Sequence, residues 1–79
     1  MELTVELKGY LVRYAPSTNR NGRFGLKIKD GATVRDVLEE INLDVQYTGL
    51  VLINGQKGKV TDRLHPGDLI SVFPLVAGG

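Results

Sequence analysis

The last predicted strand, residues 69–73, constrains the fold of this chain more than any other segment. Its sequence, Leu-Ile-Ser-Val-Phe, is apolar on both faces, whereas a strand with one face in water alternates apolar and polar side chains. We therefore expect residues 69–73 to lie at the centre of a sheet, between two other strands. Pro74 is expected to end the pairing, because proline has no N–H to donate.

Alternation predicts the first two strands. Leu3, Val5 and Leu7 alternate with polar residues, which is typical of a half-buried strand. A second alternating stretch covers residues 24–29, where apolar side chains alternate with lysines. Residues 15–22 are rich in Pro, Ser, Asn and Gly, which predicts a connecting loop longer than a tight hairpin turn.

One helix is expected after the turn at Asp30-Gly31. Thr33 can act as its N-cap, with Asp36 at the third helical position. The following apolar residues recur at the i, i+3, i+4, i+7 spacing of one helix face: Val34, Val37, Leu38 and Ile41.

The rest of the chain predicts two more strands joined by turns. Residues 50–53 are a continuous apolar run that ends at Asn54-Gly55, a dipeptide typical of tight turns. A short return is expected to begin at Val60, and residues 65–68 (His-Pro-Gly-Asp) predict a turn before the last strand. The long connection between the first and last strands allows them to pair in parallel. We therefore expect the α+β class, with a β-grasp fold: a mixed sheet of four to five strands and one helix packed across one face.

Composition allows one small domain and disfavours an enzyme. The chain has 79 residues, of which 42% are hydrophobic and 24% charged. A domain of this size buries about 60 to 65% of the surface of its unfolded chain, which leaves little room for an active-site cavity. The sequence has no cysteine, and its only histidine, His65, stands in a predicted turn. We expect a protein on which other proteins act, with no metal or cofactor of its own.

Charge and hydropathy predict neither a nucleic-acid nor a membrane partner. The net charge is +1, so a basic surface would have to come from Arg20, Arg23, Lys27 and Lys29. We interpret the two lysines as the solvent face of a strand, where they discourage edge-to-edge pairing. No apolar run approaches the roughly 20 residues of a membrane span, and no export signal begins the sequence. We expect a cytoplasmic protein that is a monomer on its own.

The sequence ends in Ala77-Gly78-Gly79. Glycine has no Cβ, so a diglycine at a free carboxyl terminus is the thinnest tail that can enter another protein's catalytic site. A carboxylate resists nucleophiles until it is activated, for example as an acyl-adenylate, and another protein must supply that activation. Chance or a linker remnant are alternative interpretations, but linkers are polar and Ser-rich, whereas residues 73–77 are apolar.

The chain resembles the MoaD/ThiS family of ubiquitin-like sulfur carrier proteins over nearly its whole length. The resemblance rests on the element order, on the turns at residues 54–55 and 66–68, and above all on residues 72–79 (Val-Phe-Pro-Leu-Val-Ala-Gly-Gly). This ending is particularly similar to the small subunit of molybdopterin synthase. The chain departs from the family pattern in a long insertion at residues 15–23 and in residues 10–14.

The resemblance implies that Gly79 is adenylated and then converted to a thiocarboxylate that donates sulfur. Gly78 and Ala77 would form the narrow segment of the tail that precedes it. It implies that ATP-Mg is used by the activating partner and not bound by this chain. The implied partners are an adenylating enzyme of the MoaB/MoeB/ThiF-like class and a sulfur donor such as a cysteine desulfurase. The implied acceptor is a larger molybdopterin synthase subunit, which places the reaction in molybdenum or tungsten cofactor biosynthesis, or another acceptor enzyme.

The diglycine alone does not distinguish among several related functions. Thiazole-forming carriers of thiamine synthesis and carriers for tRNA thiolation share this ending. A ubiquitin-like modifier that forms isopeptide bonds with target lysines is an alternative, and a plain interaction domain is a third.

The predicted division places a β-grasp domain at residues 1–73 and a flexible tail at residues 74–79. The tail can span at most about 20 Å when extended. The predicted partner-binding residues lie where the tail begins: Phe73, Pro74, Leu75 and Val76. Leu75 and Val76 are interpreted as interface, Pro74 as both a strand terminator and a guide for the tail, and Phe73 as either core or interface.

Overall fold

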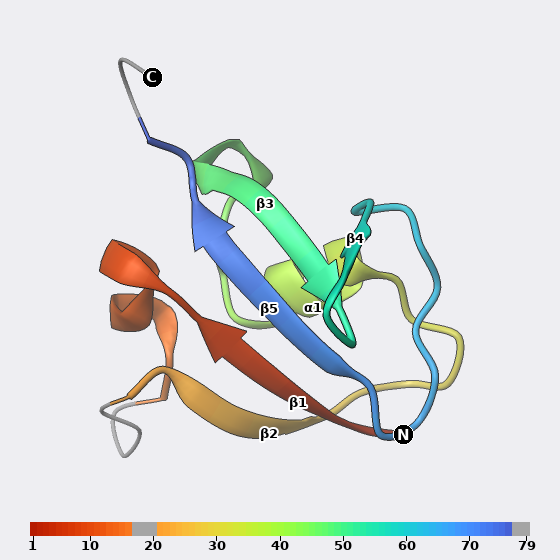
Figure 1. Ribbon diagram of the computed structural model, residues 1–79. Helices are drawn as coiled ribbons and strands as arrows, with labels where there is room; N and C mark the ends of the chain where they lie inside the picture. Colours follow the sequence, from red (N-terminus) through yellow and green to blue (C-terminus); the bar gives the residue numbers. More distant parts are fainter. Residues whose placement is uncertain (17–20, 77–79) are drawn as a thin grey trace.

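The computed structural model describes residues 1–16 and 21–76. Its elements follow in the order β1 (Glu2–Leu7), η1 (Gly9–Tyr14), β2 (Arg23–Lys27), α1 (Val34–Glu40), η2 (Val45–Tyr47), β3 (Thr48–Ile53), β4 (Gln56–Gly58) and β5 (Leu69–Pro74), where η denotes a 3-10 helix. The five strands form one mixed sheet in the order β2-β1-β5-β3-β4 (Figure 1).

Strand β5 is the central strand, as predicted from its sequence, which is apolar on both faces. It pairs in parallel with β1, where Val5 lies opposite Ile70, and antiparallel with β3, where Val51 lies opposite Val72. The outer strands β2 and β4 pair antiparallel with β1 and β3. The prediction that the first and last strands are adjacent and parallel is confirmed.

Helix α1 begins with the predicted cap. The Thr33 hydroxyl accepts a hydrogen bond from the Asp36 backbone N–H at 3.3 Å, and the Asp36 carboxylate accepts one from the Thr33 N–H at 2.9 Å. This pair of bonds satisfies two N–H groups that a helix N-terminus leaves without partners. The bond from the Thr33 N–H is the main cause that lowers the pKa of the Asp36 carboxyl.

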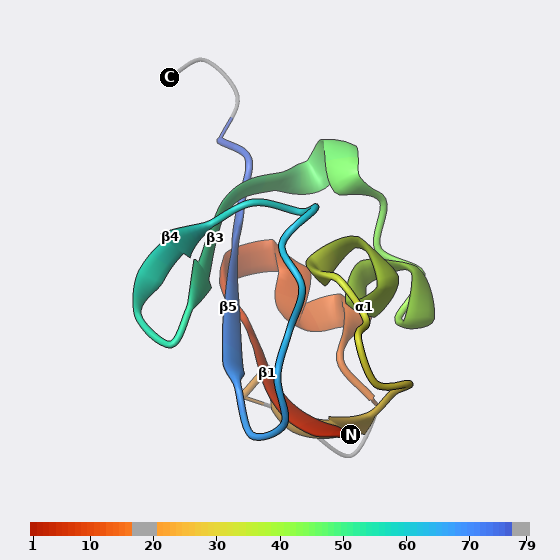
Figure 2. The ribbon, with the colours of Figure 1, turned by 90° about the vertical axis from the view of Figure 1, so that its right-hand side faces the viewer.

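The core lies between α1 and one face of the sheet. Figure 2 shows α1 on one side of the sheet, with the opposite face turned away from it. The helix contributes the buried side chains of Val34, Val37 and Leu38. The strands and η1 contribute the other large side chains that have almost no exposed surface: Leu3, Val5, Leu7, Leu11, Ile70 and Val72. This two-layer arrangement is the predicted β-grasp.

The turn before β5 is joined to the β3–β4 turn. The Asn54 side-chain amide donates to the Asp68 carboxylate at 2.8 Å, and its carbonyl oxygen accepts from the Leu69 N–H at 2.9 Å. Partial burial raises the pKa of the Asp68 carboxyl, but the hydrogen bonds from the His65 N–H and from Asn54 outweigh it, so that the pKa is lowered overall. These bonds fix the point at which β5 enters the sheet. His65 is an exposed turn residue.

Two local features differ from the prediction, and a further one was not predicted. Residues 10–14, for which the sequence indicates no regular element, lie in the 3-10 helix η1, which begins at Gly9 with a φ of +55°. The return strand β4 is Gln56–Gly58 and does not begin at Val60, because the Asn54-Gly55 turn is tight enough to pair Ile53 with Gln56.

The other difference concerns Pro74, which ends the ladder as predicted but is itself the last paired residue. Pro74 is the last residue of β5 and lies opposite Thr48, across an irregularity in the register at Gly49. The donor that proline lacks is replaced one residue later, where the Leu75 N–H donates to the Tyr47 carbonyl at 2.8 Å. The division between residues 1–73 and 74–79 stays a prediction, because residues 77–79 lie outside the described residues.

Candidate functional site at the tail root

Exposed apolar side chains gather where the chain leaves the sheet. Four large hydrophobic side chains of the described residues are strongly exposed: Tyr10 (46%), Tyr47 (43%), Leu75 (54%) and Val76 (70%). They come from η1, from η2 and from the segment after β5. Exposed apolar groups that meet on one surface are typical of a protein-binding site.

Both polar backbone groups of Leu75 are hydrogen-bonded to the folded domain. Its N–H donates to the Tyr47 carbonyl at 2.8 Å, and its carbonyl accepts from the Tyr10 hydroxyl at 3.0 Å. Tyr10 is 65 residues away in the sequence. We call Pro74 and Leu75 the tail root, because Leu75 is the last residue that these hydrogen bonds hold to the domain.

Pro74 lies between two glycines that have no room for a side chain. A Cβ added at Gly9 would lie 2.9 Å from the Pro74 Cγ, and one added at Gly49 would lie 2.7 Å from the Pro74 carbonyl oxygen. Gly9 also has a φ of +55°, a conformation that glycine adopts at low cost. The two glycines therefore allow the tail root to pass close to the backbone of η1 and of β3.

Short 3-10 helices place the two tyrosines. Leu11 anchors η1, since its side chain is completely buried in the core, and the Lys8 N–H just before η1 donates to the Val72 carbonyl of β5 at 3.0 Å. At the start of η2, the Asp44 carboxylate accepts from the Gln46 N–H at 3.0 Å. Tyr10 and Tyr47 thus project from turns that are each fixed by a local contact.

Phe73 lies on the face of the sheet that α1 does not cover. Successive side chains of a strand point to opposite faces, and its neighbour Val72 is completely buried in the core. Phe73 is half-buried, and its register partner Leu50 is half-buried beside it. Of the two interpretations of Phe73, membership of the core layer under α1 is wrong, and a role in partner binding stays a prediction.

The structure places two residues that the sequence did not indicate beside four of the predicted site residues. Phe73, Pro74, Leu75 and Val76 are consecutive, and the structure adds Tyr10 and Tyr47. The remaining predicted residues, Ala77, Gly78 and Gly79, lie outside the described residues. The signal that could have found the tyrosines is weak: two aromatic residues in segments without strand or helix periodicity.

A family model described as Mut7-C ubiquitin matches residues 1–78 of the chain. The chain belongs to the Mut7-C ubiquitin family. The resemblance to ubiquitin-like proteins of the MoaD/ThiS type, predicted from the sequence, is confirmed.

Three solved structures have the same fold as this Mut7-C ubiquitin protein. A putative molybdopterin converting factor subunit 1 from Pyrococcus furiosus is 22% identical, with a TM-score of 0.73, over 95% of this chain and 98% of that chain. Small archaeal modifier protein 1 from Haloferax volcanii is 20% identical, with a TM-score of 0.72 and the same coverage of 95% and 98%. A complex of subunits 1 and 2 of molybdopterin-converting factor from Helicobacter pylori contains a chain that is 23% identical, with a TM-score of 0.60 and 100% coverage of both chains. These similarities confirm a ubiquitin-like β-grasp.

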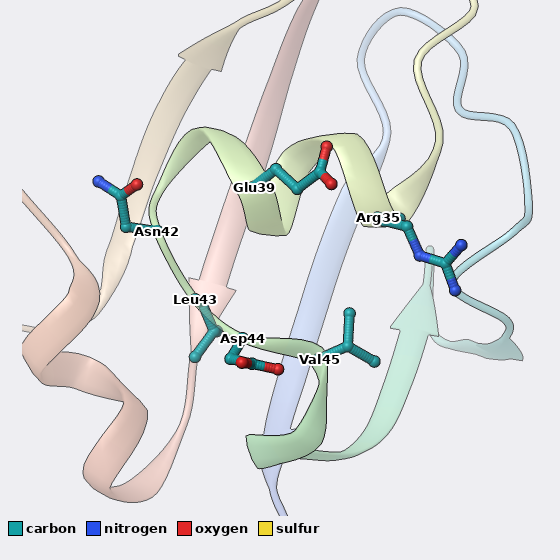
Figure 3. Close-up of a pocket in the computed structure, with 6 residues that line it drawn as sticks. All are labelled: Arg35, Glu39, Asn42, Leu43, Asp44 and Val45. Carbon is teal, nitrogen blue, oxygen red and sulfur yellow. The ribbon is translucent and has the colours of Figure 1, made fainter.

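A shallow depression of the Mut7-C ubiquitin protein is lined by residues of α1 and of the segment that leads into η2. It lies between α1 and η2, and Figure 3 shows that the side chains of Arg35 and Asn42 at its two ends point away from each other. Across residues 1–16 and 21–76, no three His, Cys, Asp or Glu side chains are placed to hold a metal ion. No helix in this described part of the chain is long and apolar enough to cross a membrane.

The basic residues of this Mut7-C ubiquitin protein are partly neutralised on the outer face of the sheet. Glu6 is paired with Lys8 at 3.1 Å and with Arg23 at 3.2 Å. The hydrogen bond from Lys8 is the first cause, and Arg23 a further one, that lowers the pKa of the Glu6 carboxyl. Lys27 and Lys29 are exposed, and Lys27 lies on the edge strand β2. Arg20 lies outside the described residues.

Proposed function

We propose that this protein is a sulfur carrier whose Gly79 carries a free carboxylate that is activated and converted to a thiocarboxylate. The observation that carries the proposal is the tail root: the chain leaves the central strand at a point held by two hydrogen bonds and surrounded by exposed apolar side chains. An arrangement of this kind suits a domain that docks on a partner and extends its end into the partner's active site.

The chemistry uses the terminal carboxylate as a substrate. The activating enzyme, of the MoaB/MoeB/ThiF-like class, binds ATP-Mg, and the Gly79 carboxylate attacks the α-phosphorus, so that pyrophosphate leaves and an acyl-adenylate forms. Hydrosulfide then attacks the acyl carbon and AMP leaves. If a cysteine desulfurase is the donor, the sulfur arrives as an enzyme persulfide, and a thiol reductant releases it as hydrosulfide while being oxidised to a disulfide. The product is a thiocarboxylate on Gly79, and this chain contributes the carrier and no catalytic group.

The length of the tail limits the shape of the partner's channel. With Gly79 as the proposed reacting residue, residues 76–79 span at most about 14 Å when extended. The residues 76–79 are Val-Ala-Gly-Gly, so the last positions present little or no side chain to a narrow passage. The surface that contacts the channel entrance is proposed to include Leu75 and Val76, with Phe73 and Pro74 behind them.

Molybdopterin biosynthesis is the pathway we propose. Two of the proteins with the same fold are named as subunit 1 of molybdopterin converting factor, and one of them is solved with subunit 2. The proposed acceptor is therefore a larger synthase subunit. A second candidate, a protein modifier that forms isopeptide bonds, is favoured by the likeness to small archaeal modifier protein 1.

Intact mass spectrometry tests the proposal. The purified chain is incubated with an adenylating enzyme, ATP and sulfide, and replacement of one oxygen by sulfur at Gly79 is the expected result. Matched controls are a chain with one residue added after Gly79 and a chain that lacks Gly79, which should fold normally and gain no sulfur. An unchanged mass of the wild-type chain, with an enzyme that is active on its own carrier, would contradict the carrier function.

The modifier candidate predicts a different product. Under that function, cellular extracts contain conjugates of higher mass in which Gly79 is joined to lysine side chains of other proteins. Peptide mass spectrometry of purified conjugates detects these linkages. Sulfur incorporation without such conjugates would favour the carrier.

A further inference from the structure

The two hydrogen bonds of Leu75 differ in kind. The bond from its N–H goes to a backbone carbonyl, that of Tyr47, and it depends on the path of the main chain. The bond to its carbonyl comes from a side-chain hydroxyl, that of Tyr10. The second bond can therefore be removed by taking away one oxygen atom, with the backbone unchanged.

We propose that Tyr10 is a positioning residue that fixes the direction in which the tail leaves the domain. Its hydroxyl holds the Leu75 carbonyl, and the orientation of that carbonyl defines the ψ angle of Leu75 and hence the path of Val76. The structural part of this inference is independent of the proposed function. Its effect on sulfur transfer rests on that function.

The position of Tyr10 is well suited to this role, because η1 is attached to the strand that carries the tail. Lys8, the residue just before η1, donates its N–H to the Val72 carbonyl of β5 at 3.0 Å. Leu11, the residue after Tyr10, is fully buried in the core. Gly9 allows Pro74 to come within contact of this segment. The tail root and the Tyr10 side chain that holds it are thus both attached to β5 and the core.

A fixed tail root lowers the entropic cost of binding. Ordering a backbone costs free energy for every residue whose dihedral angles must be restricted, and a group that is already ordered before binding avoids that cost. When Leu75 is held on both sides, a partner has to order only the residues that follow it. The exposure of the Tyr10 ring at the same place also makes it available for direct contact with the partner.

Tyr10→Phe and Tyr47→Phe are a matched pair of variants. Each loses one hydroxyl from an exposed tyrosine that flanks Leu75, and each keeps its ring. Within the described part of the chain, the Tyr10 hydroxyl has a hydrogen-bond partner and the Tyr47 hydroxyl has none, since Tyr47 contributes its backbone carbonyl. Only Tyr10→Phe should release the tail root.

Hydrogen exchange of the Leu75 amide tests the structural part. In Tyr10→Phe we expect this amide to exchange about three to ten times faster, which corresponds to the loss of one hydrogen bond. The Leu75 N–H still donates to the Tyr47 carbonyl, but the tail root opens more often once its carbonyl is released. The amides of β1 and of the rest of β5 should keep their rates, and Tyr47→Phe should match the wild type throughout. An unchanged Leu75 rate in Tyr10→Phe would overturn the inference, as would an equal increase in Tyr47→Phe.

The kinetics of thiocarboxylate formation test the functional part. Tyr10→Phe should raise KM for the activating enzyme about three- to tenfold and leave kcat nearly unchanged, because the pre-ordered tail contributes equally to the ground state and the transition state. A KM equal to that of the wild type would refute the positioning role. Failure of the wild type to form a thiocarboxylate would instead refute the proposed function, and the exchange measurement would still decide whether Tyr10 holds the tail root.

Discussion

Val5 and Ile70 lie opposite each other in the parallel pair of β1 and β5, and neither side chain is exposed to solvent. They join the first strand of the chain to the last at the centre of the sheet. In Ile70→Ala we expect a loss of about 2 to 5 kcal/mol in the free energy of unfolding, because the missing atoms leave a cavity in a dense core. Urea unfolding followed by circular dichroism measures this loss. Ile70→Val is the control and should lose about 0.5 to 1.5 kcal/mol, and equal losses in the two variants would contradict the close packing of Ile70.

The N-cap of α1 gives a second prediction. Thr33→Ala removes the hydroxyl that accepts from the Asp36 N–H and should lower the free energy of unfolding by about 1 kcal/mol. Thr33→Ser keeps a hydroxyl and should remain close to the wild type. Thermal unfolding of the three proteins provides the comparison, and a Thr33→Ser variant as unstable as Thr33→Ala would argue against the cap.

The Asp36 carboxyl makes the stability depend on pH in a defined direction. Its pKa is lowered in the folded state, chiefly by the hydrogen bond from the Thr33 N–H. A lowered pKa stabilises the fold above the unfolded pKa of about 3.9, and this contribution is lost as the pH falls through the folded pKa. Asp36→Asn should remove that part of the acid dependence. The difference in unfolding free energy between wild type and variant, measured from pH 7 to pH 2, should shrink as the pH falls, and a constant difference would contradict the assignment.

Gly49 allows the close approach of the tail root. In Gly49→Ala the new methyl group would meet the Pro74 carbonyl oxygen and the Leu75 Cα, which are backbone atoms that cannot turn away. We expect a loss of about 1 to 3 kcal/mol in unfolding free energy, as for other overpacked sites, together with faster exchange of the Leu75 amide. Gly25→Ala is the matched control, since Gly25 also lies in a strand and an added Cβ would meet its nearest neighbours at 3.8 Å and 3.9 Å. Similar losses in the two variants would show that the loss of stability comes from replacing any strand glycine, and not from the close approach of Gly49 to Pro74.

The sequence predicts those parts of the fold that depend on local pattern. Residues 69–73 are apolar on both faces, which predicts the central place of β5, and Thr33 with Asp36 three positions later predicts the start of α1. The 3-10 helix η1 has no comparable signal, because it is too short to produce a repeating apolar face. Its conformation depends on Gly9 and on the burial of Leu11 against the rest of the domain.

The contact of Tyr10 with Leu75 could not be predicted from the sequence for a different reason. The two residues are 65 positions apart and become neighbours only because β1 and β5 run in parallel, so that the residues that follow each strand meet at the same end of the sheet. The extension of β5 to Pro74 has a similar origin. It depends on the irregularity at Gly49 and on the Tyr47 carbonyl. Neither contact can be predicted from the residues that neighbour Pro74 in the sequence.

The central position of β5 has a mechanical consequence. Under the proposed carrier function, a partner that withdraws from the tail pulls along the axis of β5, and β5 is hydrogen-bonded to β1 on one side and to β3 on the other. The load acts in shear on both ladders together, so that many hydrogen bonds must break at once before the strand can slip. A terminal strand at the edge of the sheet and pulled across its ladder would instead detach one bond at a time. If the proposed function holds, we therefore expect the domain to stay folded each time its tail is withdrawn from a partner.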